Sequence, residues 1–244
     1  MRAIWLLAAL PLAACGNGAI AGNDGAAVAG QGSGATRNFA VRDFSRVELR
    51  GPDDVEVRSG AAFAVTASGD PKLLDELEIE KVGDELRIGR KDRDGFRWND
   101  DDDGGVKVMV TMPSIRGGSL AGSGDLTIDR AQGDFDASIA GSGDLAIGAI
   151  AGGAVQLAIA GSGTLSAAGN ADRLAMNIAG SGDIRASGLK ARTADVSIAG
   201  SGDASAAVSG PAEVSLVGSG SADLGSGARC TVSKLGSGEA RCGS

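Results

Sequence analysis

Apolar and polar residues alternate with a period of two from residue 118 onward, and this alternation recurs in near-identical copies. Each copy contains the tripeptide Gly-Ser-Gly, and successive tripeptides are separated by 18 to 20 residues. They begin at Gly122, Gly141, Gly161, Gly180, Gly200, Gly218 and Gly236. A nearly fixed period of this size is typical of a solenoid, in which each repeat stacks on its neighbours.

Aligning the copies on the first glycine places aliphatic residues in shared columns, two, four and six positions before it and four and six after it. The column two before it holds Leu120, Ile139, Ile159, Ile178, Ile198 and Leu216. Columns that step by two predict two strands in each copy, and the glycines predict a corner between them. We therefore expect an all-β fold, a single-stranded parallel β-helix with coils of about 19 residues, right-handed by the sterics of β crossovers.

Residues 37–117 repeat less clearly but keep the alternation of strands. We predict strands at 46–50, 54–58, 63–67 and 106–111, and a hairpin around Gly83-Asp84. Asp70-Pro71 predicts the N-cap and first residue of a short helix that runs to Leu77. We expect this segment to extend the solenoid and to cap its near end.

The first residues indicate export and membrane anchoring. Met1-Arg2 precedes a short apolar run that ends in Leu12-Ala13-Ala14-Cys15, as in a secretory signal. This ending resembles the lipobox of bacterial lipoproteins, which implies that Cys15 is lipidated and becomes the new N-terminus. Gly16 is not the Asp that resembles an inner-membrane retention signal, so we expect an outer-membrane lipoprotein facing the periplasm or the cell surface.

These features divide the chain into four parts. Residues 1–14 form the signal peptide, and residues 15–36 form the lipidated Cys and a flexible Gly- and Ala-rich tether. Residues 37–117 form the N-terminal β segment, and residues 118–244 form the repeat β-helix.

Composition narrows the classes of function. The chain of 244 residues carries a formal net charge of −8, which disfavours binding to nucleic acid. It contains no His, the commonest general base and metal ligand. We therefore predict that the protein is not an enzyme and binds no cofactor.

Two cysteines near the C-terminus fall in inward columns on opposite sides of the last corner. Because export leads to an oxidising compartment, we predict a disulfide between Cys230 and Cys242 that holds the final coil; the alternative is two buried free thiols. Lys234 interrupts its aliphatic column in the same coil, which we interpret as a terminal cap facing water.

Acidic residues gather in two places. Residues 92–103 include the run Asp100-Asp101-Asp102-Asp103. They lack the ligand spacing of an EF-hand, and we interpret them as a solvated acidic loop, with Ca²⁺ binding as the alternative. Acids also follow the corners, at Asp125, Asp144, Asp183 and Asp203. We interpret these as side chains that bond their own turn amides and hinder lateral association, with Ca²⁺ binding as the alternative.

Three segments, Phe44–Leu49, Asp54–Val57 and Gly83–Ile88, precede the repeated corners in a fixed order. This order resembles the auto-transporter adhesin head domain, or GIN domain, a bacterial family of unknown function. The resemblance covers about residues 40–240 and implies a β-helix on an exported anchor. It implies no catalytic residues.

Three functions are compatible with this pattern. The one we favour is a non-catalytic, lipid-anchored rod of the cell envelope that binds a glycan or protein ligand, as an adhesin would. The alternative is a passive envelope spacer. The third is a polysaccharide-active β-helix enzyme, which would need paired carboxylates in a groove.

Overall fold

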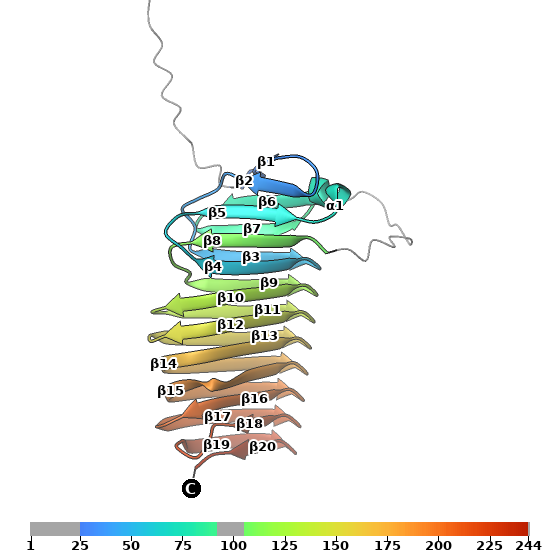
Figure 1. Cartoon of the computed structure of the whole chain (residues 1–244). Coiled ribbons are helices and arrows are strands. Elements are labelled where there is room, and N and C mark those ends of the chain that lie inside the picture. Colours follow the sequence, from blue (N-terminus) through green and yellow to red (C-terminus); the bar gives the residue numbers. More distant parts are fainter. Residues whose placement is uncertain (1–24, 92–104, 244) are drawn as a thin grey trace, which may run out of the picture.

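The computed structural model describes residues 25–91 and 105–243 of the chain. They form an elongated stack of β coils, with a short helix near the end at which the chain enters (Figure 1). Two walls of parallel strands, here called wall A and wall B, run along the stack. Among the described residues, no helix is long and apolar enough to cross a membrane.

Wall A holds the strand that leads into each glycine corner. Its strands, in spatial order from the entry end, are β7 (Glu85–Arg90), β3 (Arg46–Gly51), β9 (Gly117–Gly122), β11 (Phe135–Gly141), β13 (Ala154–Gly161), the second halves of β14 (Thr164–Gly180) and β15 (Asp183–Gly200), β17 (Pro211–Gly218) and β19 (Arg229–Gly236). Neighbouring strands pair in parallel.

Wall B holds the strand that follows each corner. Its strands in the same order are β8 (Lys107–Met112), β4 (Asp54–Ser59), β10 (Asp125–Gln132), β12 (Asp144–Ala151), the first halves of β14 and β15, β16 (Asp203–Val208), β18 (Ser221–Asp223) and β20 (Glu239–Arg241). These strands also pair in parallel.

The aliphatic columns form the core between the two walls. In wall A, Ile139 pairs with Ile159 and Ile159 with Ile178, so each side chain lies on its counterpart in the next coil. In wall B, Leu145 pairs with Leu165 in the same way. These side chains are at most 3% exposed. The predicted β-solenoid of about 19-residue coils is therefore confirmed.

A third inward row was not predicted. After wall B each coil bends and returns to wall A through a segment whose inward residues are also buried. This row contains Ala131, Ile150, Ala171, Leu189, Ala191 and Val208. In β14 and β15 the strand continues through the bend, with register shifts at that point. Each coil thus buries side chains on three sides of the core, the two walls and the return segment.

The corners require glycine for two different reasons. The first glycine of each tripeptide has a positive φ, for example 139° at Gly161, which residues with a Cβ rarely adopt. The third glycine packs against the coil before it, because a Cβ on Gly163 would collide with the carbonyl oxygen of Gly143. The first glycine therefore allows the turn, and both glycines allow the coils to approach, since a Cβ on Gly161 would also collide with the Gly141 carbonyl oxygen.

Antiparallel strands and a helix close the entry end. β6 (Leu77–Val82) pairs with β7, and β5 (Ala64–Ser68) pairs with β8. Beyond them lie β2 (Thr36–Phe39) and β1 (Gly30–Gln31). The helix α1 (Pro71–Glu76) is capped by Asp70, which accepts a hydrogen bond from the Lys72 amide. Antiparallel pairing ends the parallel stack.

The folded body begins earlier than the sequence indicated. We assigned residues 15–36 to the flexible tether, whereas residues 25–36 pack on the cap where the structure describes them. Gly25 and Val28 donate backbone hydrogen bonds to β6, and Ala27 forms a bridge with Glu80.

Asp53 closes the row of corners at the capped end. Gly51 pairs with Gly122, so Asp53 occupies the position of the third corner glycine in the later coils. Its buried carboxylate binds the Arg90 guanidinium, at 3.0 Å for Nε–Oδ2 and 2.6 Å for Nη2–Oδ1. Oδ1 also accepts the Val106 amide at 3.0 Å. One carboxylate therefore ties the end of β7 and the start of β8 to this corner.

The other end of the rod is closed by side chains rather than by a helix. Lys234 stands in the inward column, and its Nζ donates to the Gly238 carbonyl at 3.5 Å. A disulfide joins Cys230 in wall A to Cys242 after wall B, with their Cα atoms 6.1 Å apart. Val232 lies between these two features and is 45% exposed.

Candidate binding groove

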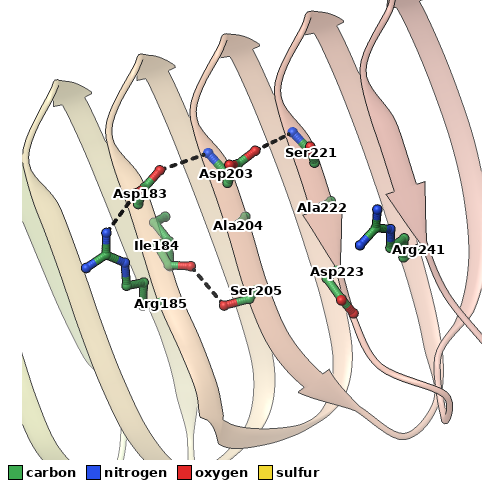
Figure 2. A pocket seen from close by; sticks show the side chains of 10 residues that line it. All are labelled: Asp183, Ile184, Arg185, Asp203, Ala204, Ser205, Ser221, Ala222, Asp223 and Arg241. Carbon is green, nitrogen blue, oxygen red and sulfur yellow. Dashed lines mark hydrogen bonds and ion pairs between the residues drawn. The ribbon is translucent and has the colours of Figure 1, made fainter.

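A shallow groove of about 320 Å³ lies on the outer side of wall B, in the last four coils. It crosses β15, β16, β18 and β20, so its long direction runs from coil to coil (Figure 2). The ten residues that line it are Asp183, Ile184, Arg185, Asp203, Ala204, Ser205, Ser221, Ala222, Asp223 and Arg241. None of these lining residues is aromatic.

The β register produces the shape of the groove. Arg185 pairs with Ser205, Ser205 with Asp223, and Asp223 with Arg241. Because outward side chains of paired residues stand side by side, these four form one row along the rod. Two long arginines at its ends and short side chains between them leave a hollow about 14 Å long, three strand spacings of about 4.8 Å.

A second row of outward residues lies beside the first and is mainly acidic. Here the Ser221 amide donates to Asp203 Oδ1 at 2.9 Å, and the Asp203 amide donates to Asp183 Oδ1 at 3.3 Å. Asp144 accepts the Thr164 amide in the same way, at 3.1 Å. Our prediction that these acids bond their own turn amides was wrong for these three, because each carboxylate bonds the amide of the next coil.

Both arginines of the groove are paired on the surface. Arg185 Nη2 lies 3.0 Å from Asp183 Oδ2. Arg241 donates from Nε and Nη2 to the two carboxylate oxygens of Glu239, each at 3.2 Å. This guanidinium lowers the pKa of Glu239 below its usual value, and the same contact raises the pKa of Arg241. The charges are therefore fixed in place while other donor atoms of each guanidinium still face the groove.

The remaining sites predicted from the sequence have different outcomes. Cys15 and the acidic loop 92–103 lie outside the described residues. The structure joins Cys230 and Cys242, and Cys242 directly follows Arg241 at the end of the groove. In the described ranges, no group of three or more Cys, Asp or Glu side chains is arranged to hold a metal ion.

The groove itself was not predicted. It arises from outward positions, which the columns of the core do not constrain. A signal was present in the sequence, because this outward row changes its chemistry along the rod. The three coils before the groove carry small, uncharged residues there, namely Thr127, Ala146 and Ser166. The last four coils carry Arg185, Ser205, Asp223 and Arg241. Comparing the outward columns as carefully as the inward ones would have found it.

A family model described as "Putative auto-transporter adhesin, head GIN domain" matches residues 43–227. The chain belongs to this family. The GIN-domain resemblance drawn from the sequence is thus confirmed, and the matched segment includes the stacked coils up to β18 and every groove residue except Arg241. A search of curated proteins found no match for this GIN-domain chain.

Solved structures share the fold. A protein from Bacteroides fragilis described as a "putative adhesin" superposes with a TM-score of 0.75 at 20% identity, covering 85% of this chain and 95% of that one. A "putative lipid binding protein" from Parabacteroides distasonis gives 0.63 at 25% identity, covering 87% and 98%. A "putative adhesin" from Parabacteroides merdae gives 0.65 at 18% identity, covering 87% and 97%.

Proposed function

We propose that this GIN-domain protein is a non-catalytic, lipid-anchored rod of the outer membrane that binds a ligand of the cell envelope or of another surface, as an adhesin does. The observation that carries the proposal is the polar groove across the last four coils. The family assignment supports it. The mixed row of charges is suited to holding a polar ligand.

The position of the groove supports a role in presentation. The described chain enters at the capped end, whereas the groove lies toward the opposite end (Figure 1). With Cys15 as the anchor, the nine residues from Gly16 to Asp24 span at most about 30 Å when extended. The capped end would then be held near the membrane, and the groove would be directed away from it.

Localisation tests the anchor. The full chain and the Cys15→Ala variant are expressed in a Gram-negative host, labelled with an alkyne fatty acid and fractionated. We expect label and outer-membrane recovery only with Cys15, and digestion by external protease if the rod faces outward. Equal labelling of both variants would refute the lipid anchor.

Binding tests the groove. Purified mature protein is incubated with whole cells and with isolated envelope polysaccharide, and the bound fraction is measured. We expect Arg185→Ala combined with Arg241→Ala to reduce binding. The control is Arg192→Ala, because Arg192 is an exposed arginine whose ion pair with Asp172 lies outside the groove. An envelope-integrity defect on deletion, combined with no measurable binding, would favour the passive spacer.

A second candidate function is lipid binding, which a specific cavity favours. A cavity of about 410 Å³ lies at the capped end, between α1, β2 and residues 27–30. Its apolar lining includes Val28, Phe39, Leu74 and Leu77, and Lys91 lies at the same cavity. Native mass spectrometry of protein purified without detergent tests this candidate: a retained lipid, lost in a Phe39→Ser variant that stays folded, would support it.

A further inference from the structure

We infer that the groove takes an uncharged, polyhydroxylated saccharide chain lying along the rod, rather than a polyanion. This inference rests on the proposed function, because it names the ligand class of the same groove. Three features carry it: acceptors that are held in place, donors at both ends, and a small net charge.

The acceptors are held by the backbone. The Ser221 amide binds Asp203 Oδ1, and the Gly225 amide binds Asp223 Oδ1 at 3.1 Å. The bond to Oδ1 orients the whole carboxylate, so that the second oxygen, Oδ2, is held in position as well. A hydroxyl group that donates to such an oxygen forms a charge-assisted hydrogen bond without the cost of ordering the side chain.

The donors stand at the two ends of the groove. Arg241 uses Nε and Nη2 for Glu239, and Arg185 uses Nη2 for Asp183. Each planar guanidinium has five N–H groups, so donors remain on both side chains. A sugar hydroxyl both donates and accepts, and adjacent hydroxyls can therefore bind a carboxylate and a guanidinium together. A carboxylate or sulfate group cannot satisfy the acidic row.

The net charge of the lining and the backbone at the bottom of the groove determine the class of ligand. The lining contains three Asp and two Arg, a formal charge of −1 (2 − 3), within a chain of net charge −8. A polyanion would be repelled at long range. The floor between the rows is the backbone at Ala204 and Ala222, which allows the flat side of a sugar ring to approach closely.

The groove has no aromatic platform, so the affinity of one site should be weak. Recognition by hydrogen bonds alone, in a shallow and solvated groove, favours millimolar dissociation constants. Several anchored rods on one membrane would then bind a long polysaccharide together, and avidity would supply the retention. This mode suits attachment to a surface rather than uptake of a small molecule.

The test compares matched polysaccharides. Mature protein is titrated by ¹H–¹⁵N NMR with dextran, mannan and a β-glucan, and with dextran sulfate as the anionic counterpart of dextran. We expect at least one neutral polymer to shift the amides of Asp203, Ser221 and Asp223, and dextran sulfate to leave them unchanged. Tighter binding of dextran sulfate, or shifts confined to other coils, would overturn the inference.

Two variants make the test specific to the groove. Asp203→Asn keeps an acceptor for the Ser221 amide but replaces the second oxygen by a donor, and we expect about a tenfold loss of affinity, as for one hydrogen bond to a charged group. Asp144→Asn is the control, because Asp144 makes the same inter-coil bond outside the groove. Equal losses in both variants would refute the role of Asp203.

The same series separates the two levels of the argument. If the wild-type protein binds cells but none of the neutral polymers, the ligand class is wrong and the proposed binding function stands. If it binds neither cells nor any polymer, the proposed function itself fails.

Discussion

Replacing Asp53 with glycine would give the first corner the pattern Gly-x-Gly-Asp of the later coils, yet we expect the change to destabilise the protein. Sequence consensus alone would suggest a neutral or favourable substitution. In the structure, however, the third corner glycine serves to let the next coil approach, whereas Asp53 bonds the end of β7 and the start of β8. Agreement with the repeat would therefore remove a necessary contact.

The expected loss follows from the bonds of the carboxylate. Asp53 is fully buried, and Asp53→Gly would leave the buried Val106 amide without its acceptor, a cost of about 1–3 kcal/mol. Breaking a buried ion pair costs about 3–5 kcal/mol, but the Arg90 side chain is 26% exposed and can regain water. The added backbone freedom of glycine costs about 0.5–1 kcal/mol. We expect a total of about 3 kcal/mol.

Urea denaturation followed by circular dichroism measures the change in the free energy of unfolding. Hydrogen exchange resolved by segment then locates it, because coils of a solenoid are stabilised mainly by their neighbours. We expect faster exchange in β7, β8 and the corner at 51–54, and little change beyond β13. The control is Asp54→Ala, since Asp54 is exposed, and it should change stability by less than about 0.5 kcal/mol.

Two results would refute this reasoning. One is an unfolding free energy for Asp53→Gly within experimental error of the wild type. The other is an equal loss in both variants, which would show that any acid at this corner contributes through general charge rather than through the buried bonds.

Three further predictions concern pH and the far end of the rod. The Ser45 hydroxyl lowers the pKa of Asp84, and the Arg241 guanidinium lowers the pKa of Glu239. The stabilisation from these two carboxylates is present above their unfolded pKa values and is lost as pH falls through their folded pKa values. Melting temperatures should therefore be flat from about pH 5 to 8 and drop below about pH 4. Replacing both Cys230 and Cys242 with Ser should cost about 3 kcal/mol, seen as faster exchange in the last coil; unchanged exchange there would argue against a stabilising disulfide. Lys234→Ile should promote end-to-end association in sedimentation experiments, because the charged side chain on this edge strand hinders pairing; a monomer at all concentrations would contradict this.

The inward half of the structure was readable from the sequence. The columns through Ile159 and Leu165 step by two and recur at every corner, and burial of aliphatic side chains allows only one stacking that keeps them inside. The hairpin at Gly83-Asp84 and the cap at Asp70 were equally clear, because local turn and capping chemistry determines them. These predictions depend on short-range rules that repeat along the chain.

Other features depend on contacts that no local rule specifies. The pairing of Asp53 with Arg90 joins residues 37 positions apart. The stacking of β3 between β7 and β9 places an early strand between two later ones. The groove needs Arg185 and Arg241 to be three coils apart on an outer face. The first two require the three-dimensional register. The groove arginines, in contrast, share one outward column five positions after the corner glycine, which the inward columns do not constrain.

The parallel register of the coils has a consequence for how such a protein can change its reach. Each coil pairs only with its two neighbours, and the middle coils share their corner glycines and aliphatic columns. Duplication or loss of one such unit of 18 to 20 residues would therefore shift the groove by about 4.8 Å relative to the capped end while leaving its chemistry intact. The distance between the groove and the capped end is thus a quantity that gene duplication can adjust in equal steps.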